Sequence, residues 1–80
     1  MLEEAVAAVA SAGIAVIVTS ELLVFGNGCY AIGRHETASQ IYASIVERDP
    51  SHSDARFNLG LTYLRLRSPE DAVREFTDVL

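Results

Sequence analysis

The side chains of this 80-residue sequence best suited to metal binding or catalysis are two histidines and one cysteine. His35 and His52 are far apart, and neither has a further ligand at a spacing typical of a zinc site. Both fall in predicted turns, where we expect them to be exposed. Cys29 lies on the apolar face of a predicted helix, which is typical of a buried small hydrophobic residue. The sequence therefore predicts no metal, no cofactor and no enzyme.

Two other patterns resemble a catalytic acid pair and a phosphate-binding loop, but neither has the features that such a site requires. Glu70 and Asp71 lie at the start of a predicted helix, where the positive end of the helix dipole stabilises carboxylates. The run Gly26, Asn27, Gly28 has the composition of a phosphate loop. It lacks the preceding strand and the lysine that such a loop requires.

The charge and composition of the sequence limit the kinds of partner that we expect it to bind. The net charge is −5, half of the residues are hydrophobic, and no lysine occurs. Nucleic-acid binding needs clustered positive charge, so we expect no nucleic-acid partner. A chain with this hydrophobic content can form a packed core, but a domain of this size is only marginally stable alone.

Residues 55–80 read as two short helices with a break at Ser68 and Pro69. Apolar residues recur at helical spacing on both sides of the break. Ser68 is a natural N-cap and Pro69 a natural first helical residue. Such a hairpin cannot bury its apolar faces alone, so a second copy is expected.

A second copy appears when the chain is shifted back by about 34 residues, a distance that we call the repeat period. The pair Leu59 and Gly60 then matches Phe25 and Gly26, and Phe76 matches Tyr42. Small residues align with small ones and aromatic residues with aromatic ones, which is typical of a repeat. A glycine inside a helix costs about 1 kcal/mol relative to alanine, so Gly26 and Gly60 predict close approach of a neighbouring helix.

This pattern resembles the tetratricopeptide repeat, through Leu59, Gly60, Tyr63, Ala72 and Phe76 in the later copy. The earlier copy keeps Gly26, Gly33, Ala38, Tyr42 and the closing Pro50. The resemblance implies an all-α fold, a right-handed α-α superhelix of helical hairpins. The first repeat would span residues 19–52 and the second would span residues 53–80. An apolar helix over residues 1–18 would precede them.

The repeat register predicts helices over residues 20–32 and 36–48, with Gly33 as a helix C-cap. The first helix should turn Leu22, Phe25, Cys29 and Ile32 to the core. The second helix should turn Ala38, Ile41, Tyr42 and Ile45 inward, and Val73 should point inward from the last. Ser51 or Ser53 is the expected N-cap of the third helix.

The apolar residues 1–18 have several interpretations. We expect one helix, which Gly13 could end or bend, packed against the first repeat. Residues 14–18 are apolar on every side, so periodicity does not decide between helix and strand there. Glu3 and Glu4 argue against a signal peptide, which needs positive charge before its apolar core. A membrane anchor through residues 1–25 is the alternative, although the run is short of the roughly 20 apolar residues that a span needs. We expect a cytoplasmic protein, with membrane association as the alternative.

The resemblance also implies a concave groove that binds a peptide or a partner helix. The first helix of each hairpin would line the groove, and the N-terminal helix covering the groove is the alternative. Some relatives grip a peptide carboxylate with two asparagines, which Asn27 and Asn58 match, but Leu23 stands where such a clamp has a lysine. The expected partner-binding residues are Leu23, Asn27, Tyr30, Phe57, Asn58, Leu61 and Arg65.

Two repeats leave the last helix without a neighbour. Repeat arrays generally need about three units. Tyr63, Phe76, Val79 and Leu80 would then lie at an open edge. We therefore expect self-association or further repeats in a longer chain.

Overall fold

The computed structural model describes residues 19–79. This part of the chain is all-α, as predicted, and contains no strand. The expected bounds of the first two helices, 20–32 and 36–48, were right to within one residue. The four helices are α2 (Thr19–Ala31), α3 (His35–Arg48), α4 (Ser53–Arg65) and α5 (Pro69–Val79).

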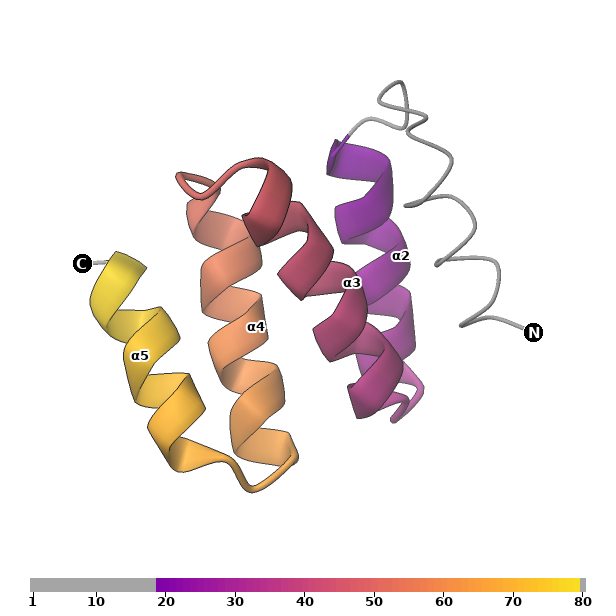
Figure 1. Cartoon of the computed structure of the whole chain (residues 1–80). Coiled ribbons are helices and arrows are strands. Elements are labelled where there is room, and N and C mark those ends of the chain that lie inside the picture. Colours follow the sequence, from indigo (N-terminus) through magenta and orange to yellow (C-terminus); the bar gives the residue numbers. More distant parts are fainter. Residues whose placement is uncertain (1–18, 80) are drawn as a thin grey trace.

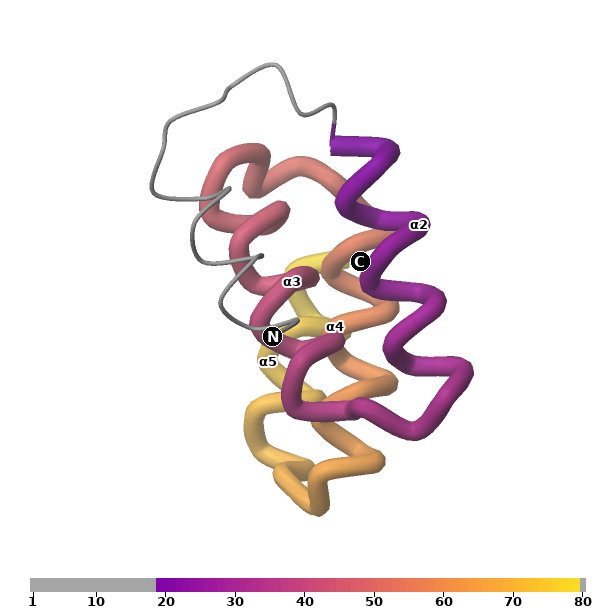
Figure 2. Tube along the Cα trace, turned by 90° about the vertical axis from the view of Figure 1, so that its right-hand side faces the viewer, coloured from indigo at the N-terminus to yellow at the C-terminus, as the bar shows by residue number. Residues whose placement is uncertain are grey.

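The helices form two hairpins that lie side by side. The first hairpin, residues 19–48, consists of α2 and α3, and the second, residues 53–79, of α4 and α5. Each helix packs against the next one in the chain, so α3 and α4 join the two hairpins (Figure 1). A view from the side shows α2 running along one edge of the molecule (Figure 2).

The two hairpins have the same backbone pattern. Thr19 and Ser53 begin their helices one repeat period apart, and so do His35 and Pro69. The loops within the two hairpins share one arrangement. A residue with positive φ follows the first helix, and two backbone N–H groups of the loop donate hydrogen bonds to carbonyl oxygens in the last turns of that helix. The donors and acceptors are Gly33 to Tyr30 (3.1 Å), Arg34 to Cys29 (2.8 Å), Arg67 to Leu64 (3.2 Å) and Ser68 to Tyr63 (2.8 Å).

A glycine and an aromatic ring meet inside each hairpin. A Cβ atom on Gly26 would lie 2.8 Å from Cε1 of Tyr42, and one on Gly60 would lie 2.5 Å from Cε1 of Phe76. Neither position has room for a side chain. The predicted close approach is therefore confirmed, and the ring that fills the space comes from the second helix of the same hairpin.

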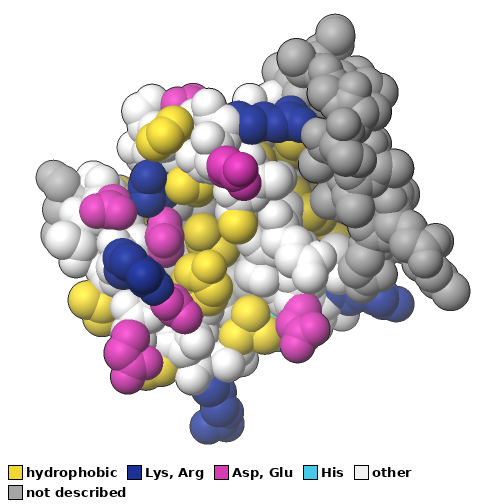
Figure 3. Space-filling model, in the orientation of Figure 1, with side chains coloured by type: hydrophobic (Ala, Val, Ile, Leu, Met, Phe, Trp, Pro, Cys, Tyr) yellow, Lys and Arg dark blue, Asp and Glu magenta, His cyan; other side chains and the backbone are white. Residues whose placement is uncertain are grey.

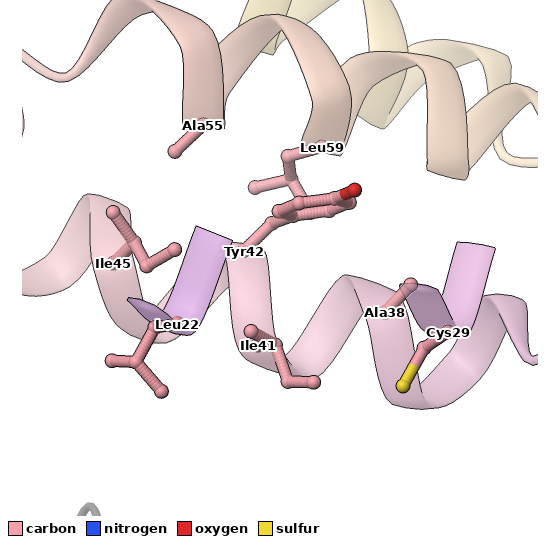
Figure 4. Close-up of a cluster of buried hydrophobic side chains, with 8 residues drawn as sticks. All are labelled: Leu22, Cys29, Ala38, Ile41, Tyr42, Ile45, Ala55 and Leu59. Carbon is pink, nitrogen blue, oxygen red and sulfur yellow. The ribbon is translucent and has the colours of Figure 1, made fainter. Parts of the chain in front are cut away.

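The core lies where three helices meet. Tyr42 and Ile45 of α3 point towards α4, while Ile41 lies towards α2 (Figure 4). Cys29 is buried, as predicted. The cluster comprises Leu22, Cys29, Ala38, Ile41, Tyr42, Ile45, Ala55 and Leu59.

Three residues that we expected in the core are exposed instead. Phe25 is 41% exposed, Ile32 71% and Val73 63%. Leu22 and Cys29 mark the middle of the α2 face that packs on α3, and Phe25 and Ile32 lie towards its edge because of the 3.6-residue turn. The described residues place no helix beyond that edge.

Histidines take up structural positions at two helix starts. The Nδ1 atom of His52 accepts a hydrogen bond from the backbone N–H of Ala55 at 3.1 Å, so His52 is the N-cap of α4. The predicted cap, Ser51 or Ser53, was wrong; the Ser51 hydroxyl donates to Asp49 instead. His35 begins α3 and is half-buried, as is His52, so the expectation that both are exposed was wrong as well.

None of the helices in residues 19–79 is long and apolar enough to cross a membrane. The predicted N-terminal helix and most of the possible anchor over residues 1–25 lie outside the described residues.

Candidate functional site

A cavity of about 270 Å³ opens between the first helices of the two hairpins. We call it the α2–α4 groove. Asn27 and Tyr30 come from α2, Asn58 and Leu61 from α4, and Tyr42 from α3 forms part of the wall. The counterpart of Asn27 in the second hairpin is Leu61, and Asn58 lies one helical turn before it. The groove therefore brings together amides from two different positions of the repeat.

Asn27 links all three helices of the groove. Its Oδ1 atom accepts a hydrogen bond from the Tyr42 hydroxyl at 2.5 Å and another from Nδ2 of Asn58 at 3.1 Å. These two bonds use both lone pairs of the oxygen. The amide orientation of Asn27 is thereby set, and its Nδ2 group stays available as a donor.

The Tyr42 ring is fully buried, with only its polar tip in the groove. Burial raises the pKa of Tyr42 to about 12, because the low-dielectric surroundings disfavour the phenolate. The hydroxyl is therefore neutral at physiological pH and remains a donor to Asn27.

Arg65 and Tyr30 form one rim of the groove. Nε of Arg65 donates to the Tyr30 hydroxyl at 3.0 Å, and this bond raises the pKa of the guanidinium above its usual value. The Tyr30 ring also meets the ring of His35 edge-on, with centroids 5.1 Å apart. Tyr30 is thus held by two neighbours and presents its hydroxyl at a defined place.

The structure gathers most of the predicted site residues. Asn27, Tyr30, Asn58 and Leu61 line the groove, and Arg65 joins them through Tyr30. Two predicted residues lie elsewhere. Leu23 packs against the core cluster, and the Phe57 ring lies against that of Phe76 in α5, with centroids 5.5 Å apart.

Tyr42 is the residue that sequence reasoning missed. We assigned it to the core as the counterpart of Phe76, and its ring does lie there. Its hydroxyl was the available signal, because a buried tyrosine usually brings its O–H to a polar partner. The equivalent position in the second hairpin is a phenylalanine and makes no such bond.

The groove offers groups suited to hydrogen bonding. Among residues 19–79, its polar groups are amides, hydroxyls and one guanidinium, and no carboxylate or histidine of these residues lines it. Elsewhere in residues 19–79, no cluster of three histidine, cysteine or acidic side chains could hold a metal ion.

Acidic and arginine side chains alternate over the second hairpin (Figure 3). Across this hairpin, Arg56 of α4 bonds to Glu75 at 3.0 Å and to Asp78 at 3.1 Å, both in α5.

Comparison with protein-family models gives no match for this chain, and comparison with curated proteins gives none either.

Proposed function

We propose that this chain is a non-enzymatic protein-interaction module of the tetratricopeptide-repeat type. Residues 19–52 and 53–80 are its two repeats and form the beginning of a right-handed superhelix. A peptide or partner helix binds in the α2–α4 groove. The partner is a protein, not a nucleic acid, and the module acts in the cytoplasm.

The repeat assignment is supported by the spacing of matched contacts. Helix starts, loop hydrogen bonds and the glycine–aromatic contacts all recur after one repeat period. That period is the length of a tetratricopeptide unit, in which each hairpin packs against the next.

The observation that carries the binding function is the composition of the groove. Among the described residues, neither Nδ2 of Asn27 nor Oδ1 of Asn58 has a hydrogen-bond partner, so a backbone amide of a partner could satisfy both. Leu61 lies beside these amides, and Leu64 extends the apolar rim along α4 at 49% exposure. A few polar groups fixed among apolar ones are typical of ligand sites.

Peptide selection against the full chain tests this proposal. Peptides selected from a random library are titrated against the chain and against the variants Leu61→Ala and Arg65→Ala. Each substitution should weaken binding about tenfold or more, because a few contact residues usually carry most of the binding free energy. Val73→Ala, on the exposed side of α5, is the control and should bind as the parent chain does.

Helicity measured by circular dichroism shows whether each variant has folded. Peptides that bind folded Leu61→Ala and Arg65→Ala chains with unchanged affinity would place the binding surface outside the groove. The rival function, a membrane-anchored assembly factor, is tested by cell fractionation. A chain that stays in the membrane pellet after an alkaline wash would exclude the cytoplasmic module.

A further inference from the structure

Arg65 differs from the other arginines of α4 and α5. Arg56 and Arg74 pair with carboxylates of α5. Arg65 is exposed, and its only bonded partner among the described residues is the neutral hydroxyl of Tyr30. The helix dipole favours a cation in the last turn of α4, but it does not explain why this one reaches across the groove to α2. A positive charge is thus held in one place without an opposite charge.

Tyr30 holds this guanidinium in a way that leaves several donors available. Its oxygen accepts from Nε of Arg65 at 3.0 Å, so the two terminal nitrogens of Arg65 remain as a fork. Neither these nitrogens nor the hydroxyl proton of Tyr30 has an acceptor among residues 19–79. A carboxylate has two oxygens that only accept, and it fits such a fork with two parallel hydrogen bonds.

The groove side of α4 changes in charge along its length. Asp54, Asn58, Leu61 and Arg65 recur at steps of three and four residues, so they form one stripe of the helix. Asp54 is exposed at the beginning of the stripe and Arg65 at its end. The fork of Arg65 lies about 10 Å along the helix axis from the amide of Asn58. A ligand that follows the groove therefore meets an acid, an amide, a leucine and a base in this order.

The two asparagines are suited to a peptide unit rather than to a carboxylate. They leave one donor, Nδ2 of Asn27, and one acceptor, Oδ1 of Asn58. A peptide unit has one acceptor and one donor, whereas a carboxylate has no donor and would be repelled by Oδ1 of Asn58. In a helical partner these backbone groups already bond to each other, so an extended segment fits better.

We propose that the α2–α4 groove selects an extended peptide segment that carries an aspartate or glutamate side chain. The carboxylate binds the terminal nitrogens of Arg65 and the Tyr30 hydroxyl. This inference rests on the peptide-binding function proposed above, and it adds the charge that the partner must carry. An extended chain rises about 3.3 Å per residue, so the acidic residue lies about three residues from the peptide unit that the asparagines hold. An acidic residue at the other end of the peptide would face Asp54 and weaken binding.

Selection from a random library of ten-residue peptides with amidated C-termini tests the charge preference. On the full chain, aspartate and glutamate should be enriched several-fold at one position of the peptides. On the Arg65→Gln variant this enrichment should disappear. Arg48→Gln is the matched control, because it removes the same charge from the last turn of α3, outside the groove, and should keep the enrichment. The net charge of the chain is −5, so general attraction cannot enrich acidic peptides.

Titration of one selected peptide measures the contact itself. Exchanging its acidic residue for the matching amide should weaken binding to the parent chain about fivefold, near the upper end for an exposed ion pair. The same exchange should have less than a twofold effect on the Arg65→Gln variant. Tyr30→Phe should also reduce the effect, because it removes the hydroxyl that holds Arg65. Since the exchange in the peptide uses the unsubstituted chain, it stays decisive if a variant fails to fold.

Failure of this inference differs from failure of the peptide-binding function. Selected peptides that Leu61→Ala weakens, but that show no acidic enrichment, would overturn the charge preference and leave the groove function in place. Peptides that bind the Leu61→Ala chain unchanged, or a library that yields no binder, would overturn both. Binding that requires a free peptide C-terminus, seen in a parallel library without amidation, would assign the anion to the terminal carboxylate and contradict the proposal.

Discussion

In the first hairpin the aromatic ring that faces a helix glycine is Tyr42, and it is fully buried. In the second hairpin the equivalent ring is Phe76, and it is only half-buried. The two contacts have the same geometry inside the hairpin. The two rings differ in burial because of helices outside their own hairpins. Helix α4 lies over Tyr42, whereas the described residues place no helix over Phe76. Burial in this molecule is set by the neighbouring hairpin.

The two rings are also held differently. The Tyr42 hydroxyl donates to Asn27, which fixes the ring at its tip as well as at its sides. Phe76 has no such bond, and its ring meets Phe57, itself 48% exposed. We therefore expect the aromatic ring of the second hairpin to rearrange more readily than that of the first.

Truncating the two rings should give the largest changes in the free energy of unfolding. These variants should also show the difference between the two hairpins most clearly. Tyr42→Ala removes a ring from the core and its bond to Asn27, so we expect a loss of about 3–5 kcal/mol in the free energy of unfolding. Such a loss is comparable to the stability of a whole small domain. Phe76→Ala removes a half-buried ring and should cost less than half as much.

Urea denaturation of both variants measures the difference. Equal losses would show that Phe76 is as well covered in solution as Tyr42, for example by a second copy of the chain. The comparison therefore also tests the predicted self-association, which should make the Phe76→Ala effect depend on protein concentration.

The sequence was sufficient for the features that local chemistry determines. Helix bounds followed from periodicity, from Pro69 and from Gly33, and the inward residues of α3 followed from its spacing. The glycine contacts were predictable because glycine in a helix interior needs a compensating close approach. The groove was predictable in part, because the repeat register turns Asn27 of α2 and Asn58 of α4 to the same side. The bond between the two amides was not, since they differ in repeat position.

Features that depend on a neighbour were not predictable from one hairpin. Phe25, Ile32 and Val73 have the spacing of core residues, but no described helix covers them. Phe57 has the spacing of a groove residue, but its ring lies against Phe76. The cap His52 was missed because its imidazole, unlike a serine hydroxyl, is rarely considered as an N-cap acceptor.

Replacing each helix glycine by alanine should change the free energy of unfolding less than truncating the rings. It compares the two glycine–aromatic contacts more directly. Gly26→Ala forces Tyr42 to move, and Tyr42 is held by Asn27, so overpacking of about 1–3 kcal/mol should exceed the gain of about 1 kcal/mol in helix propensity. At Gly60→Ala the Phe76 ring can turn outward, and the two terms should nearly cancel.

Thermal unfolding of the two alanine variants checks this ranking. The distances alone would predict the opposite ranking of the two variants, because the added Cβ would lie closer to the ring at Gly60 (2.5 Å) than at Gly26 (2.8 Å). A larger loss for Gly60→Ala would show that the Phe76 ring is as firmly held as Tyr42.

A last, small effect concerns the loops within the hairpins. The positive-φ residue is Gly33 in the first hairpin, with φ 85°, and Arg67 in the second, with φ 60°. A side chain in this conformation costs about 1–2 kcal/mol, and a glycine loses about 0.5–1 kcal/mol in extra chain entropy on folding. Arg67→Gly should therefore raise the free energy of unfolding by about 0.5–1 kcal/mol, which corresponds to a rise of a few degrees in melting temperature. Arg67→Ala is the matched control, because it removes the charge and keeps the unfavourable φ. Stabilisation by glycine but not by alanine would locate the effect in the backbone, and equal stabilisation by both would assign it to the lost guanidinium.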